Sequence, residues 1–158
     1  MKKVLIGLVF IMFGIGTAIA ADNQSMTTSA TNASAKPLAA NDIIVKTPHI
    51  QLMQNNANSA EAFMELDNKS NTPVALIAAN SMTAHQTLLH KFVKRNGELT
   101  MKKVNKIVIR PHSDTELQPG GFHVMLLGLK QALQKGDSVP ILLIFEDGSS
   151  ITIHATVS

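Results

Sequence analysis

Two histidines and two methionines carry the side chains in this sequence that are best suited to bind a soft metal ion. Ten residues separate His90 from Met101, 21 residues separate Met101 from His123, and one valine separates His123 from Met125. Thioether sulfur is soft and uncharged, so two imidazoles with two thioethers favour Cu(I), whereas Zn(II) prefers thiolate, imidazole or carboxylate. The alternative is that the methionines fill a core and the histidines are structural.

A β-hairpin is predicted to position the first two candidates. An Asn-Gly dipeptide at 96–97 lies between two β-forming arms, which is typical of a two-residue hairpin turn. In that register His90 lies opposite Lys103, and Phe92 lies opposite Met101. Residues two apart on a strand share a face, so His90 and Met101 become diagonal neighbours about 7–8 Å apart. A three-residue turn would break this arrangement.

The second pair lies on one predicted strand, "FHVMLLGLK". Alternation along a strand places His123 and Met125 on one face, together with Leu127 and Leu129. The preceding "PGG" supplies a turn that can bring this strand to the hairpin. We expect the ligands to lie near a rim, where a side chain can be truncated without opening a core cavity.

The rest of the folded region has the pattern of an all-β protein. Short apolar or alternating runs are broken by Asn, Gly, Pro and Asp from residue 43 to residue 158. Their spacing predicts roughly seven to nine strands in a sandwich or Greek-key barrel. One helical turn is expected near "LKQALQKG", at 129–136.

The N-terminal region predicts export. Residues 1–20 combine a positive start, an apolar run and small residues in A-x-A spacing, which is typical of a signal peptide cleaved before Ala21 or Asp22. Residues 21–42 are polar and aperiodic, and are expected to form a flexible low-complexity leader. No second long apolar run follows, so we expect a soluble protein in a bacterial periplasm. The sequence has no cysteine, which excludes thiol chemistry, a blue-copper centre and lipid attachment at a cysteine.

The charge of the chain is concentrated in one segment. Without the two lysines of the predicted signal peptide, 12 basic residues face 11 acidic ones, so no general affinity for polyanions is expected. Residues 91–110 nevertheless hold seven basic residues and one acid, Glu98. This segment is either a solvated face or a docking patch for an acidic partner. The sequence has no Trp or Tyr to stack on bases, which argues against nucleic-acid binding.

The four candidates and their surroundings resemble the periplasmic copper chaperones of the PCuAC family. The spacing His-x10-Met-x21-His-x-Met matches that family's motif. The similarity extends over residues 60 to 154 and includes the segments "AFMELDN", "NGELTMKKV", "ELQPGGFHVMLLGLK" and "GDSVPILLIFEDGSSITI". Family members often carry methionine where this chain has Lys91 and Leu99, so a methionine-rich entry path is less evident here.

The resemblance implies a cupredoxin-like β-sandwich that binds Cu(I) through His90, Met101, His123 and Met125. It also implies delivery of copper to the copper-bearing subunit of cytochrome c oxidase, directly or through a Sco-type protein. Two alternatives remain open: a periplasmic copper buffer or resistance protein, and a metal-free interaction module.

An enzyme is not expected, because the polar residues show no catalytic motif. Asp114, Glu116 and Asp147 lie in no recognisable pattern, and thioether ligands poorly serve a metal-activated water. The remaining histidines are expected to be structural or exposed, and His112 to contact a carboxylate such as Asp114. These histidines are His49, His85, His112 and His154.

Overall fold

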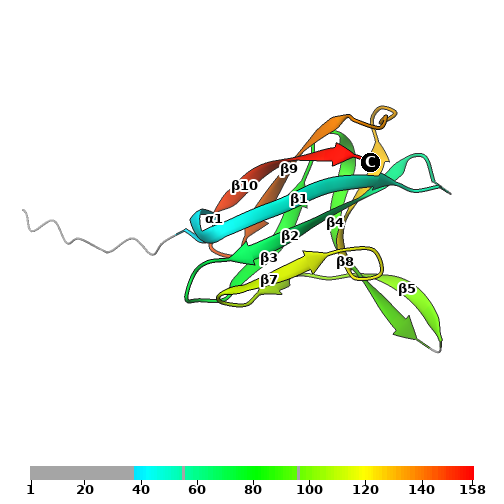
Figure 1. Cartoon of the computed structure of the whole chain (residues 1–158). Helices are drawn as coiled ribbons and strands as arrows, with labels where there is room; N and C mark the ends of the chain where they lie inside the picture. Colours follow the sequence, from blue (N-terminus) through cyan, green and yellow to red (C-terminus); the bar gives the residue numbers. More distant parts are fainter. Residues whose placement is uncertain (1–37, 55, 96) are drawn as a thin grey trace, which may run out of the picture. The chain divides into compact units, whose positions relative to one another are not determined.

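Ten strands and one short helix form the part of the chain that the computed structural model describes, residues 38–54, 56–95 and 97–158 (Figure 1). The predicted signal peptide, its cleavage site and most of the predicted leader lie outside these residues. None of the described helices is long and apolar enough to cross a membrane. The elements are α1 (Ala39–Asp42), β1 (Ile43–Leu52), β2 (Ser59–Asn68), β3 (Val74–Asn80), β4 (Ala84–Arg95), β5 (Glu98–Lys103), β6 (Ile107–Ile109), β7 (Ser113–Leu117), β8 (Phe122–Leu129), β9 (Ser138–Phe145) and β10 (Ser150–Val157).

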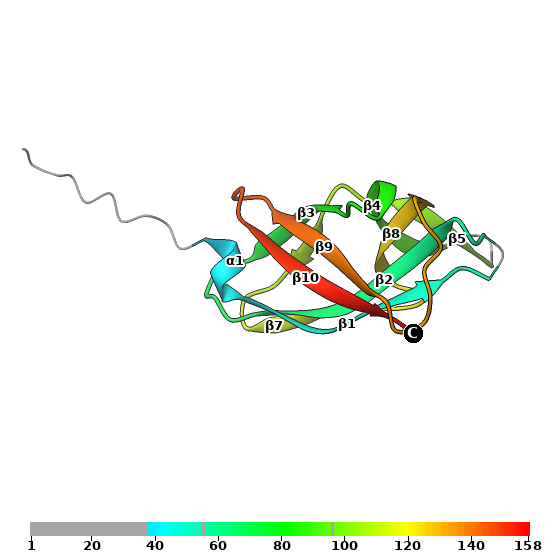
Figure 2. The same ribbon diagram turned by 90° about the horizontal axis from the view of Figure 1, so that it is seen from above.

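The strands hydrogen-bond in the order β5-β4-β8-β7-β2-β1-β10-β9-β3-β6, and β8 also pairs with β2. Figure 2 shows the antiparallel strands β9 and β10 side by side. β1 joins two halves of the sheet order, β5-β4-β8-β7-β2 on one side and β10-β9-β3-β6 on the other. It is antiparallel to β2 and parallel to β10 through His49 and Ile50. A register shift between Lys46 and His49, with Thr47 at φ 46°, interrupts the β1–β2 ladder. The all-β prediction is confirmed, although the described strands number ten rather than seven to nine.

The hydrophobic core draws side chains from both halves of the sheet order. Leu66 of β2 and Leu126 of β8 are fully buried in it, as are Leu76 of β3 and Phe145 of β9. On β10 buried and exposed positions alternate, as expected for a strand with one face on the core. Burial of this apolar surface is the main stabilising contribution, because no disulfide can form in a chain without cysteine.

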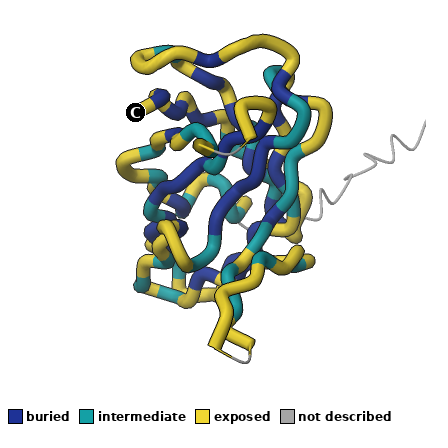
Figure 3. The backbone as a smooth tube through the Cα atoms, turned by 90° about the vertical axis from the view of Figure 1, so that its right-hand side faces the viewer, coloured by how far each residue is buried: buried dark blue, intermediate teal, exposed yellow. Residues whose placement is uncertain are grey.

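The β4–β5 hairpin has the predicted register and projects away from the remaining strands (Figure 1). His90 pairs with Lys103 and Phe92 pairs with Met101, as the Asn-Gly turn predicted. Gly97 has φ 88°, a conformation that favours glycine, whereas position 96 lies outside the described residues. The distal half of the hairpin is exposed (Figure 3).

The folded part begins earlier than the sequence predicted. Ala39–Asp42, assigned above to the leader, form α1, and their backbone is hydrogen-bonded to the turn between β9 and β10. The N–H of Ala39 donates to Asp147 Oδ2 at 2.7 Å, and the N–H of Ala40 donates to Ser149 Oγ at 3.0 Å. These partners are more than 100 residues away in sequence, so local composition gave no sign of the contact.

Two local predictions are wrong around the end of β8. Leu129 packs in the core instead of sharing the face of His123, because Gly128 adopts φ 65° and disrupts the alternation. A Cβ at Gly128 would also come within 3.1 Å of the His85 ring. The helical turn expected at 129–136 is absent from this described segment, which continues from β8 into irregular turns with Leu133 buried in the core.

Candidate metal centre

Strand pairing brings all four predicted ligands to one face of three neighbouring strands. His90 of β4 pairs directly with His123 of β8, while Met101 of β5 lies opposite Phe92. Directly paired residues point to the same face, as do residues two apart on one strand. His90, Met101, His123 and Met125 therefore share a face, and the His90–His123 pair joins the two halves that the sequence predicted separately.

This face is the outer face of the sheet. The core-facing residues of these strands are the intervening ones, among them Leu89 of β4 and Val124 and Leu126 of β8. Even so, His123 is fully buried and Met125 is only 5% exposed. β8 is thus covered on both faces, which explains why its burial does not alternate.

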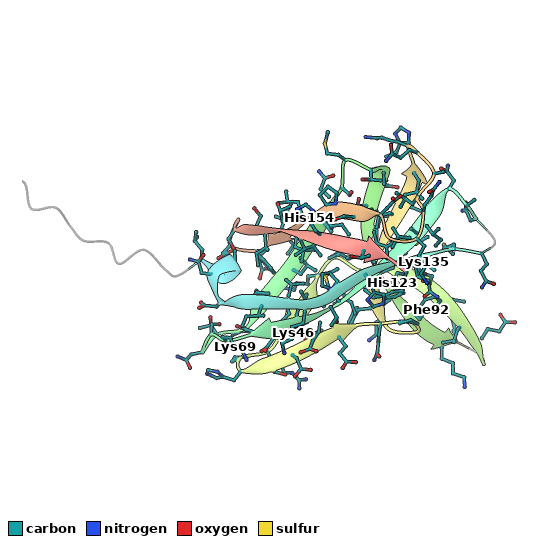
Figure 4. All side chains as sticks on the ribbon, turned by 45° about the horizontal axis from the view of Figure 1, so that its top comes forward. Lys46, Lys69, Phe92, His123, Lys135 and His154 are labelled. Carbon is teal, nitrogen blue, oxygen red and sulfur yellow. The ribbon has the colours of Figure 1, made fainter. Side chains whose placement is uncertain are left out.

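Aromatic rings form the cover over His123. The Phe92 ring centroid lies 5.2 Å from that of His123, and the Phe63 centroid lies 6.2 Å from it. Figure 4 shows Phe92 and His123 near one another at the base of the hairpin. The expectation that all four ligands lie near a rim, where truncation opens no cavity, is therefore wrong for the buried β8 pair, whereas His90 and Met101 are partly exposed.

The hydrogen bonding of His123 leaves one ring nitrogen available. Its Nδ1 lies 3.3 Å from the carbonyl oxygen of Gly121, which can only accept, so we assign the proton to Nδ1. Nε2 then carries a lone pair, and it is buried without a hydrogen-bond partner among the described residues. Metal-binding histidines commonly donate their other N–H to a backbone carbonyl in this way.

His90 presents a second buried nitrogen without a partner. Its ring packs edge-on against His123, with the centroids 5.6 Å apart and the planes at 90°. His90 Nδ1 is buried and makes no hydrogen bond within the described chain. Buried polar atoms in proteins are nearly always paired, so two such nitrogens on directly paired residues indicate a site for a ligand or ion.

Both imidazoles are held in the neutral form. Burial lowers the pKa of His123, and the hydrogen bond to Gly121 opposes that shift only in part. Burial is also the main cause that lowers the pKa of His90, with further contributions from His123 and Lys103 and an opposing one from Glu61. Near neutral pH the lone pairs are therefore available without loss of a proton.

Glu61 is a site residue that the sequence did not indicate. It lies on β2 opposite Met125, and its Oε1 is 3.7 Å from His123 Nε2. Burial raises the pKa of this carboxyl group, although His90 opposes the shift. The β2–β8 pairing that places Glu61 here joins segments about 60 residues apart, so no short motif could reveal it.

The remaining histidines have other contacts, and one of them, His49, lies on this face beside Phe63, with their ring centroids 5.6 Å apart. His112 Nε2 lies 2.6 Å from Asn71 Oδ1, so the predicted contact with Asp114 is wrong. His49 Nδ1 contacts its own turn at Thr47 O, and His154 lies on β10 near Ser138. Across the described ranges, no three His, Cys, Asp or Glu side chains already surround a common metal position.

Comparison with solved structures shows which class of protein this chain is similar to. The chain is 31% identical to the Cu(I)-bound solution structure of DR1885 from Deinococcus radiodurans, over 82% of this chain and 85% of that one, with a TM-score of 0.62. The copper-bound PCuAC domain of PmoF2 has the same TM-score at 23% identity, over 74% and 92% of the two chains, and shows the shared fold. The resemblance to PCuAC domains and the cupredoxin-like sandwich are confirmed.

The chain belongs to the LpqE-like family, whose model, described as "Putative lipoprotein LpqE-like", matches residues 43–157. A curated relative, "Putative lipoprotein Lxx21020" of Leifsonia xyli subsp. xyli, is 34% identical over 97 residues, which is 61% of this chain. The match spans 58% of the length of that relative. This sequence contains no cysteine to which a lipoprotein's lipid could be attached.

Proposed function

We propose that this protein is a Cu(I)-binding metallochaperone that holds one copper ion between His90, Met101, His123 and Met125. The observation that carries the proposal is the direct pairing of His90 with His123, each with a buried and unpaired ring nitrogen. Copper is the cargo here and not a resident cofactor. The Cu(I)-bound and copper-bound states of similar structures support the same ion for this chain.

The ligand set suits an ion that must later be released. Imidazole and thioether are neutral, so the protein holds Cu(I) without the anionic grip of thiolates. His123 and Met125 are positioned by a strand buried on both faces, while His90 and Met101 are carried by strands that continue into the exposed hairpin. Such a site can open on the side of His90 and Met101, while His123 and Met125 stay in place. A binding and transfer role follows from this chemistry, and we propose no catalytic reaction.

The proposed recipient is the copper-bearing subunit of cytochrome c oxidase, reached directly or through a Sco-type protein. The hairpin that carries Met101 offers a surface for such a contact, because it is exposed and strongly basic. Among the described residues its cations form no salt bridge within 4.0 Å. These cations are Lys91, Lys94, Arg95, Lys102 and Lys103. An acidic surface around the recipient's copper site would complement them.

We place this activity in the periplasm after export through a cleaved signal peptide. The N-terminal pattern supports export, and the lipoprotein descriptions of the family and of the Leifsonia relative agree with an envelope location. The absence of cysteine favours release as a free protein over a lipid anchor.

Competition with a Cu(I) chelator under anaerobic conditions tests the proposed ligands. We expect His90→Ala, Met101→Leu, His123→Ala and Met125→Leu each to weaken Cu(I) binding at least about tenfold, because each removes one donor. Leucine keeps the volume of methionine, which limits loss of packing in the two methionine variants.

His85→Ala and His112→Ala serve as matched controls, because these histidines are exposed and stand apart from the four ligands. Both variants should bind Cu(I) as the parent does. Parent-like binding in the Met101 and Met125 variants, combined with copper loss in His85→Ala, would show that the ion is held elsewhere.

A further inference from the structure

The carboxylate of Glu61 faces the free nitrogen of His123 with no described group between them. Glu61 Oε1 and His123 Nε2 are 3.7 Å apart, and the Glu61 side chain is only 15% exposed. Within the described residues, no Lys or Arg pairs with Glu61 and no hydrogen bond reaches its carboxylate. A largely buried anion without a cation is unfavourable unless another positive charge comes to it.

The two facing atoms are both electron-pair donors. With the proton of His123 assigned to Nδ1, which donates a hydrogen bond to Gly121 O, Nε2 presents a lone pair toward the carboxylate oxygen. Their separation is too long for a hydrogen bond. It is close to the spacing of two donors on one tetrahedral ion, about 3.4 Å for metal–donor distances of about 2.1 Å. A cation bound between them would satisfy both atoms.

The Cu(I) ligand set proposed above does not need this carboxylate. Carboxylate oxygen is a hard, charged donor that suits divalent ions, whereas thioether sulfur suits Cu(I). Glu61 nevertheless lies opposite Met125 in the β2–β8 register, so one hard and one soft donor lie side by side next to the same imidazole. Either kind of donor can therefore complete a metal site together with the two imidazoles.

We infer that Glu61, His90 and His123 form a second ligand set, for a divalent ion of the Cu(II) or Zn(II) class, at the position where the two methionines complete a Cu(I) set. This inference rests on the proposed function, because both sets use the same imidazoles. His90 must turn its ring to join the other two ligands, since the three are not yet gathered around one point in the described chain. The oxidation state of copper then selects the donors, so the protein keeps copper in either state.

Glu61→Gln is the decisive variant, because it keeps the shape of the side chain and removes the charged donor. We titrate the purified parent and variant with Zn(II), which has no redox chemistry, with Cu(II) in air, and with Cu(I) anaerobically against a chelator. Glu61→Gln should weaken Zn(II) and Cu(II) binding at least about tenfold and change Cu(I) binding less than about threefold. The Cu(II) electron paramagnetic resonance spectrum should change with the loss of an oxygen donor.

Two further variants make the result specific. Glu116→Gln removes an exposed carboxylate from β7 and should bind every ion as the parent does. Met125→Leu should show the opposite selectivity to Glu61→Gln, with weaker Cu(I) binding and parent-like Zn(II) binding. Circular dichroism of the metal-free variants checks that each one is folded.

Several results would overturn the inference. These are the absence of Zn(II) and Cu(II) binding by the parent, unchanged divalent binding and spectrum in Glu61→Gln, or an equal loss of all three ions in that variant. The last result would make Glu61 a general electrostatic contributor. Failure of the proposed function itself has a different signature, because Cu(I) binding would then be insensitive to Met101→Leu and Met125→Leu.

Discussion

The β8 half and the hairpin half of the proposed copper site differ in how firmly the fold holds them. His123 and Met125 are buried on a strand that is covered on both faces. His90 and Met101 are partly exposed, and the hairpin on which they lie projects from the remaining strands (Figure 1). In the proposed site, this difference predicts a fixed half that positions the ion and a more accessible half through which the ion enters and leaves.

The two halves of the proposed site also differ in how much their ligands contribute to packing. The β8 ligands contribute to a small cluster on the outer face, where Phe63 and Phe92 pack against His123. We therefore expect their removal to change both stability and copper affinity. The ligands near the hairpin contribute less to packing, so their removal should act mainly on copper.

The largest expected effect is a difference in stability between two histidine variants without metal. His123→Ala removes a fully buried ring and should lower the free energy of unfolding by about 2 kcal/mol or more, through the cavity it leaves. His90→Ala should lower it by less than about 1 kcal/mol, because His90 is partly exposed. Urea denaturation followed by circular dichroism measures both values. Equal losses would remove the distinction between a fixed half and an accessible half.

Local patterns in the sequence predicted each half of the site but not how the halves meet. The Asn-Gly dipeptide predicted the observed pairing of Met101 with Phe92, and strand alternation predicted that His123 and Met125 share one face. The pairing of His90 with His123 depends on the order of β4 and β8 in the sheet, which local periodicity does not encode.

Long-range packing also explains why the burial of His123 and the position of Glu61 were not predicted from the sequence. The burial of His123 depends on Phe63 of β2 as well as on Phe92 of the hairpin. Glu61 reaches the site through the same β2 strand. Leu129 does not lie on the predicted face, because Gly128 has a positive φ, which strand alternation does not anticipate.

A smaller effect is expected when the charge of the hairpin is reduced. Lys94→Gln combined with Lys102→Gln removes two exposed cations and leaves His90 and Met101 in place. Transfer of Cu(I) to an acidic copper acceptor, followed by stopped-flow mixing, should slow by roughly threefold to tenfold at low salt, because electrostatic attraction mainly raises association rates.

The difference should largely disappear at about 0.5 M salt, where surface charges are screened. Lys130→Gln combined with Lys135→Gln is the matched control, since these two exposed lysines lie outside the hairpin. Equal slowing by both double variants would show that net charge, and not the hairpin, governs transfer. Unchanged transfer in both would show that surface charge does not govern this step, and would contradict the proposed role of the hairpin cations.

The smallest expected effect is a pH dependence of stability that comes from the two imidazoles. Burial lowers the pKa of His90 and His123 below the ordinary value of about 6.5. Between those lowered values and 6.5 the unfolded chain binds more protons than the folded chain, so the free energy of unfolding should fall as the pH drops through this window. Below the lowered values both states are protonated and the dependence should level off.

Thermal melting of the metal-free protein between pH 7.5 and pH 5 measures this slope. The raised pKa of Glu61 acts with the opposite sign, because its protonation stabilises the folded state as the pH falls, so the Glu61→Gln background isolates the imidazoles. In that background His90→Ala should flatten the slope in part, and the remainder should come from the more deeply buried His123. His112→Ala, which changes an exposed histidine, should leave the slope unchanged. A slope that responds to His112→Ala and not to His90→Ala would place the titrating groups outside the site.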